Sequence, residues 1–163
     1  MHALATTDTA PILSHAIALG YTLADAGLLV GGTKDLAVGT VLKKCGSSFG
    51  PTVVKAIMCN WLVCMAVWLA GSANDLAGKM VGIWFPISTF VAIGLEHSVA
   101  NMFLLPLGML GGADVSLSQV IFKNMLPVTL GNAIAGALIV AAGYSYAFGK
   151  LGGEDEKGWQ VKK

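Results

Sequence analysis

Three long apolar stretches dominate the chain, and the first of them predicts one membrane-spanning helix. Residues 51–70 read "PTVVKAIMCNWLVCMAVWLA" and contain one charge, Lys55, near the start. At about 1.5 Å of rise per residue, a helix of this length reaches about 30 Å, the thickness of the hydrocarbon core of a bilayer. Pro51 at its start and the polar "GSAND" after its end are suitable helix start and stop signals.

The second apolar stretch, residues 80–110, is too long for one straight span, because as a continuous helix it would extend roughly 46 Å. Four residues that weaken or break helices punctuate it: Pro86, Gly94, Pro106 and Gly108. The pattern therefore predicts a broken helix with non-helical backbone near its middle. Glu96 and His97 follow that midpoint directly.

The third stretch, residues 121–148, predicts another span in which Gly131 and Gly136 allow close helix contact. Residues 150–163 are polar and predict an exposed tail. Residues 10–31 are only moderately apolar and hold His15, Asp25 and several glycines, so a further span there is left open.

Composition points to lipid as the main solvent of this chain. It is 55% hydrophobic and 12% charged, with a mean hydropathy of +0.73, whereas a soluble domain is about one quarter charged. A net charge of +1 gives no argument for nucleic acid as a partner. The three cysteines do not suggest a disulfide framework, and no Cys or His pair has a familiar metal-ligand spacing. We expect no cofactor.

An acid and a base side by side in apolar sequence need an explanation, since a charge at bilayer depth costs roughly 2.5–3.5 kcal/mol. Beside a predicted helix break, Glu96 and His97 are better explained as part of a permeation pathway than as helix-packing contacts. His97 titrates near neutral pH and could donate a hydrogen bond or a proton to an anion. A neutral acid crosses an apolar constriction more cheaply than its anion.

Each apolar stretch also carries an asparagine: Asn60, Asn101 and Asn132. Asparagines can join packed helices by hydrogen bonds or line a pathway, and the residues alone leave both roles open. On a helix beginning near Glu96, His97 and Asn101 would share a face. The N-terminus of that helix would also present a positive dipole end that favours an anion.

Two lysines, Lys43 and Lys44, precede the first stretch. They could form a positive vestibule that concentrates anions, or they could simply reach the lipid head groups. The pattern does not choose between these roles.

Three segments resemble the formate/nitrite transporter family, in the order that this family uses them. They are "CNWLVCMAVW" (59–68), "FVAIGLEHSVANMFLLPLGM" (90–109) and "NMLPVTLGN" (124–132). The resemblance covers about residues 33–149 and corresponds to the last three of six membrane helices. It implies an all-α bundle of broken helices with an aquaporin-like protomer fold, assembled as a pentamer with one pore per protomer.

The resemblance also implies roles for individual residues. His97 is similar to the central pore histidine of the family, and Glu96, Asn101 and Asn60 are similar to its hydrogen-bonded partners. Phe90 is similar to an apolar constriction residue of the family. Lys44, five positions before Phe49, is similar to a basic vestibule residue, and Asn132 is similar to a pathway residue of the sixth helix. The lipid bilayer, small monovalent anions and protons are the implied partners.

The first three helices of the family are not recognisable in residues 1–40, which match it poorly and hold at most the remnant of a third helix. Residues 41–149 form the predicted transmembrane region, and residues 150–163 the tail. Because one wall of the pore is not recognisable, we expect either a fragment or a chain that needs a partner to complete its fold.

Three functional hypotheses follow from these observations. The first is transport of small monovalent anions of the formate/nitrite class, linked to protons through His97. The second is a truncated membrane subunit that does not transport. The third, an intramembrane enzyme using Glu96 and His97 as acid and base, lacks a nucleophile or metal set to accompany them. The sequence leaves open whether the membrane is a plasma membrane or that of an organelle.

Overall fold

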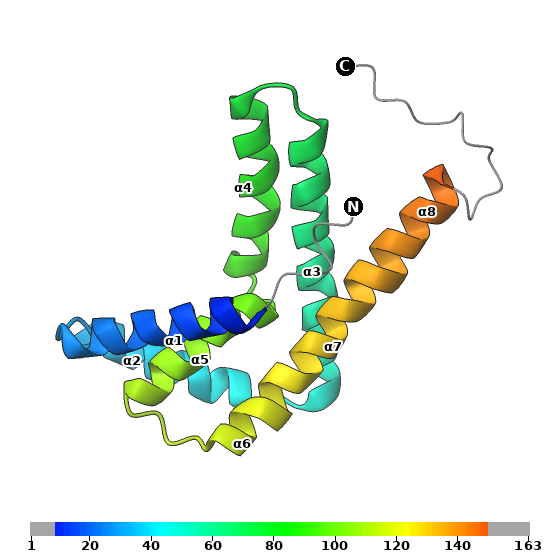
Figure 1. Cartoon of the computed structure of the whole chain (residues 1–163). Coiled ribbons are helices and arrows are strands. Elements are labelled where there is room, and N and C mark those ends of the chain that lie inside the picture. Colours follow the sequence, from blue (N-terminus) through cyan, green and yellow to red (C-terminus); the bar gives the residue numbers. More distant parts are fainter. Residues whose placement is uncertain (1–8, 150–163) are drawn as a thin grey trace. The chain divides into compact units, whose positions relative to one another are not determined.

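The structure, a computed structural model, describes residues 9–149, and every element within this range is helical. The first part of the chain forms α1 (Thr9–Asp25), α2 (Gly31–Cys45), α3 (Phe49–Ser72), α4 (Leu76–Ala92) and α5 (Ser98–Leu110). The last part is one continuous helical segment that contains two π-helical stretches (Figure 1). Its parts are α6 (Leu117–Gln119), η1 (Val120–Met125), α7 (Leu126–Ile134), η2 (Ala135–Ala142) and α8 (Gly143–Phe148).

The three apolar stretches become helices as predicted. Residues 51–70 lie in α3, and residues 80–110 are divided into α4 and α5 by a non-helical segment, as predicted. Of the four punctuating residues, only Gly94 lies at this break, whereas Pro86, Pro106 and Gly108 lie within the helices. Two helices of the described range, Phe49–Ser72 and Leu117–Phe148, are long and apolar enough to cross a membrane by length and composition. The predicted tail and the first eight residues lie outside the described residues.

The described residues divide into two compact units, of which the first comprises residues 9–52 and 97–127. In this unit α5 packs against both α1 and α2, and η1 contacts α2 and α5. Its apolar core consists of Val41, Cys45, Leu105 and Val120. Helices α2 and α5 approach closely because α5 has Gly108 at the contact, where a Cβ would lie 2.1 Å from Cγ2 of Val41.

The second unit comprises residues 53–96 and 128–149. Here α3 and α4 form an antiparallel hairpin (Figure 1). Asp75 caps the N-terminus of α4, where its side chain accepts a hydrogen bond of 2.8 Å from the amide of Gly78. Capping of this kind satisfies an amide that the helix itself leaves unpaired. The core cluster of this unit consists of Cys59, Phe90 and Leu95.

Small residues bring α3 and α7 together, as the sequence predicted for Gly131. A Cβ at this glycine would lie 2.6 Å from Cβ of Ala56 and 2.6 Å from the carbonyl oxygen of Val53. Close approach of this kind favours helix association in lipid, because the hydrophobic effect does not drive helices together there and close packing must do so.

We predict that Gly131→Ala destabilises the chain by about 1–3 kcal/mol, because the added methyl group cannot fit against α3 without moving it. The free energy of unfolding in detergent micelles measures this effect. Gly71→Ala on α3 is the matched control, since a Cβ there meets nothing within 4 Å. Equal stability of the two variants would contradict the close contact.

Candidate functional site

The interruption between α4 and α5 begins with a glycine that stops α4. Gly94 has φ of 70°, and its amide donates to the carbonyl of Val91 at 3.1 Å. The next amide, of Leu95, donates to the carbonyl of Phe90 at 3.0 Å. This pair of bonds is the Schellman motif, which glycine favours because it adopts positive φ without strain.

The apolar contact that usually accompanies this motif is present. Phe90 and Leu95 are both 9% exposed and belong to one buried cluster with Cys59 of α3. The structure therefore places Phe90, the predicted constriction residue, in the apolar packing that holds the end of α4.

His97 caps the helix that follows. Its backbone is extended, with φ of −112° and ψ of 120°, and α5 begins at Ser98. The Nδ1 atom of its imidazole accepts hydrogen bonds from the amides of Val99 at 3.1 Å and Ala100 at 3.4 Å. These two amides belong to the first turn, where a helix leaves its donors unpaired.

This geometry differs from the sequence expectation in two ways. The helix begins near Glu96, at Ser98, but His97 is its cap with an extended backbone and therefore does not share a helical face with Asn101. The amides of the helix N-terminus, expected to favour an anion, are engaged in part by the ring of His97 itself. A side chain that can accept hydrogen bonds satisfies these donors locally, whereas the sequence predicts that an anion accepts from them.

The cap also sets the chemical state of the imidazole. Because Nδ1 accepts two hydrogen bonds, the proton of the neutral ring is on Nε2, which is a donor. An imidazolium carries a proton on both nitrogens, so protonation of His97 at Nδ1 requires the cap to open. Capping of α5 and a positive charge on His97 therefore exclude each other.

In the second unit, Asn132 joins α3 to the interruption. Its Nδ2 donates to the carbonyl of Ala56 at 2.9 Å and to the carbonyl of Glu96 at 3.1 Å. In return, Nδ2 of Asn60 donates to the backbone carbonyl of Asn132 at 2.7 Å. Glu96 and Asn132 are both buried, at 4% and 7% exposure. Three predicted site residues thus lie together, connected through backbone carbonyls.

In the first unit, a second pair of asparagines joins α5, η1 and the end of α2. Nδ2 of Asn101 donates to Oδ1 of Asn124 at 2.8 Å, and Nδ2 of Asn124 donates to the carbonyl of Lys44 at 3.4 Å. The predicted vestibule residue, Lys44, lies in the last turn of α2 and is half-buried.

Asn124 was missed by the sequence analysis, although it begins the quoted motif "NMLPVTLGN". It is fully buried, while its neighbour Lys123 is exposed. An asparagine within an apolar stretch, like the three that were selected, is the signal that could have found it.

The predicted site residues are divided between the two units at the peptide bond from Glu96 to His97. The first unit contains His97, Asn101 and Lys44, and the second contains Glu96, Asn60, Phe90 and Asn132.

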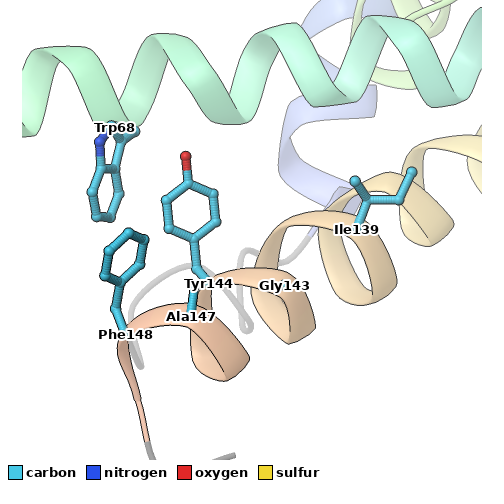
Figure 2. A pocket seen from close by; sticks show the side chains of 6 residues that line it. All are labelled: Trp68, Ile139, Gly143, Tyr144, Ala147 and Phe148. Carbon is cyan, nitrogen blue, oxygen red and sulfur yellow. The ribbon is translucent and has the colours of Figure 1, made fainter. Parts of the chain in front are cut away.

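An open groove of about 340 Å³ lies elsewhere in the second unit, beside the end of α8. Figure 2 shows Trp68 of α3 facing Tyr144 and Phe148 of α8, with ring centroids of Trp68 and Tyr144 4.5 Å apart. The hydroxyl of Tyr144 donates to the sulfur of Met65 at 3.5 Å. None of the predicted site residues lines this groove, so it is separate from the interruption.

Comparison with known proteins identifies the class of this chain. The sequence profile described as "Formate/nitrite transporter" matches residues 13–146. Over 82% of this chain and 51% of the relative, the sequence is 47% identical to the "Probable formate transporter" of Methanothermobacter thermautotrophicus. It is 40% identical to a formate channel of Bacillus thuringiensis, over 76% of this chain and 47% of that protein.

Solved structures agree with these relatives. A pentameric formate channel with formate bound has a TM-score of 0.75 and 28% identity, covering 83% of this chain and 62% of that one. An ion channel of the same family has a TM-score of 0.76 and 32% identity, covering 83% and 55%. This chain is a helical membrane protein with the fold of these channels. It belongs to the formate/nitrite transporter family, and it spans about half the length of the curated relatives that it matches.

We predict that His97→Ala loosens the first turn of α5, whereas His97→Asn preserves it. Asparagine is a good N-cap and alanine is not, and the difference is about 1 kcal/mol. Hydrogen exchange at the amides of Val99 and Ala100 should therefore be about fivefold faster in the alanine variant. Exchange in the alanine variant that is as slow as in the wild type would show that the imidazole does not cap this helix.

We predict that Asn132→Leu destabilises the second unit by about 1–3 kcal/mol, because the buried carbonyls of Ala56 and Glu96 lose a donor. Unfolding in micelles measures the loss. The same change at the exposed Asn74, between α3 and α4, is the control and should change stability little. A similar effect at both positions would argue against the hydrogen bonds of Asn132.

Proposed function

We propose that this chain forms part of a transmembrane pathway for small monovalent anions of the formate/nitrite class, with His97 as the polar group that meets the anion. Membership of the formate/nitrite transporter family is the observation that carries this proposal. It is supported by the position of the imidazole, at an interruption between two apolar helices. Ionisable groups at such positions in membrane proteins usually belong to substrate or proton pathways.

The chemistry of His97 suits this role in two protonation states. The neutral ring presents Nε2–H, which can donate a hydrogen bond to a carboxylate or to nitrite. An imidazolium can transfer its proton to the anion, so that the neutral acid forms and the ring becomes neutral. The acid then crosses the apolar constriction at lower cost than the anion.

The other candidate residues have supporting roles in this proposal. Phe90 contributes to the apolar constriction, and the ammonium group of Lys44 attracts anions toward it. Glu96 precedes His97 directly, and Asn101 follows it by one helical turn. Asn132 holds the backbone of the interruption at the carbonyl of Glu96, and Asn60 in turn donates to the backbone carbonyl of Asn132.

We further propose that the protein works as a homo-oligomer in the bilayer, and specifically as a pentamer. The similar formate channel is described as pentameric, which supports this assembly. The relatives are named as transporters and channels, which favours transport over the hypothesis of an intramembrane enzyme.

A second candidate is a membrane subunit that does not transport by itself. It is favoured by the coverage, since the chain matches about half of each relative. Uptake of labelled formate by proteoliposomes that contain the purified 163-residue chain separates the two candidates. Uptake above that of protein-free liposomes supports transport, and its absence from a folded, reconstituted sample supports the second candidate.

For the transporting protein, we predict that His97→Asn removes or strongly alters the pH dependence of formate uptake between about pH 5 and 8, where histidine changes its charge. Asparagine keeps a cap for α5, so the change isolates the loss of titration from the loss of structure. Initial uptake rates across this pH range measure the effect. An unchanged pH profile would count against protonation of His97.

A further inference from the structure

Asn124 is a buried polar side chain of the first unit that the proposed pathway does not use. It lies on η1 and is fully buried, whereas Phe122 beside it is 65% exposed. We propose that Asn124 is a positioning residue that fixes the imidazole of His97 in the tautomer and orientation needed to meet the anion. This inference deepens the proposed function and rests on it.

Both ends of the Asn124 carboxamide are engaged. Its oxygen accepts the hydrogen bond from Asn101 at 2.8 Å, and its nitrogen donates to the carbonyl of Lys44 at 3.4 Å. The carbonyl of Lys44 is one of the last of α2, where a helix leaves its acceptors without intrahelical donors. Asn124 therefore connects the C-terminus of α2 to the first half of α5.

Asn101 carries this connection to His97. It follows His97 by one helical turn, and its amide donates to the carbonyl of His97 at 2.9 Å. The intervening amides, of Val99 and Ala100, hold the Nδ1 atom of the ring. Because Asn101 is fixed at its side chain, the turn that holds the imidazole is fixed with it.

The π-helical turn explains how Asn124 reaches this position. At the end of η1 the amide of Leu126 donates to the carbonyl of Ile121, five residues earlier, which is the π-helical spacing. The following residue, Pro127, has no amide hydrogen to continue an ordinary α-helical pattern. The widened turn packs against α2 and α5 and places Asn124 between them.

A purely structural role makes a different prediction. The apolar cluster of Val41, Cys45, Leu105 and Val120 packs the same elements together without Asn124. If Asn124 served only to hold the unit together, its loss would lower the amount of folded protein and leave the state of the His97 ring unchanged.

The experiment measures the tautomer of His97 directly, by NMR of the full chain labelled with ¹⁵N-histidine in lipid nanodiscs. The chain has three histidines, and His97→Asn identifies the resonances of His97. In the wild type we expect the Nε2–H tautomer to dominate. In Asn124→Leu we expect the ratio of Nε2–H to Nδ1–H tautomer to fall roughly tenfold, as for loss of one buried hydrogen bond.

Three further variants make the result specific to a hydrogen-bond donor and acceptor at position 124. Asn124→Asp should restore the wild-type ratio, because a buried carboxyl group is neutral and then has one acceptor and one donor in place of the amide. Thr52→Val is the matched control: it removes a buried hydroxyl of the same unit that donates to the carbonyl of Ser48 at 2.9 Å, and should leave the ratio unchanged. Asn124→Ser, which keeps a polar group too short to reach Asn101, should behave as Asn124→Leu and replaces it if that variant does not fold.

The inference is overturned if Asn124→Leu and Asn124→Ser leave the tautomer ratio of His97 unchanged, or if Thr52→Val lowers it equally. Formate uptake per folded protein is measured on the same samples. If the tautomer ratio of His97 is unchanged in Asn124→Leu and the protein still takes up formate, only the role of Asn124 is contradicted. If the tautomer ratio falls in Asn124→Leu but no sample, the wild type included, takes up formate, the positioning role is supported and the proposed function is contradicted.

Discussion

Every backbone donor and acceptor at the interruption between α4 and α5 must find a partner inside the protein, because hydrocarbon offers none. The sequence meets this requirement at both sides of the break. The amides of Gly94 and Leu95 close α4 with two backbone bonds. His97 accepts from two amides of α5, and Asn132 donates to the carbonyl of Glu96. The non-helical segment that bears the ionisable pair can persist between two apolar helices because these bonds replace those of a continuous helix.

Asparagine serves this purpose repeatedly in the chain. A carboxamide has both a donor and an acceptor and carries no charge, so it can connect two backbones without the desolvation cost of an ion. Asn60 and Asn132 do so in the second unit, and Asn101 and Asn124 in the first. What distinguished these residues from the aliphatic background in the sequence was their polarity, and the structure shows that this polarity is directed at neighbouring helices and loops.

The sequence predicted the helical character of the chain and the broken second stretch, because hydrophobic length and the position of Gly94 are local signals. Pro86 and Pro106, which also suggested a break, lie within α4 and α5. It also selected the asparagines that join the helices of the second unit. It did not predict that His97 is the cap of α5, because a histidine near a helix start carries a weaker capping signal than serine or aspartate. Asn124 was missed because its partners, Asn101 and Lys44, lie 23 and 80 residues away along the chain and only tertiary packing brings them together.

Asn124 and Asn132 stand on one continuous helical segment, and each is bonded to different neighbours. Each residue of an α-helix turns the chain by about 100° and advances it by about 1.5 Å. Removing or adding a single residue within η1 before Asn124 would thus turn its carboxamide away from Asn101 and Lys44. The same change in α7 before Asn132 would turn that carboxamide away from Ala56 and Glu96. Each unit thus sets the register of its own part of this helical segment through one asparagine.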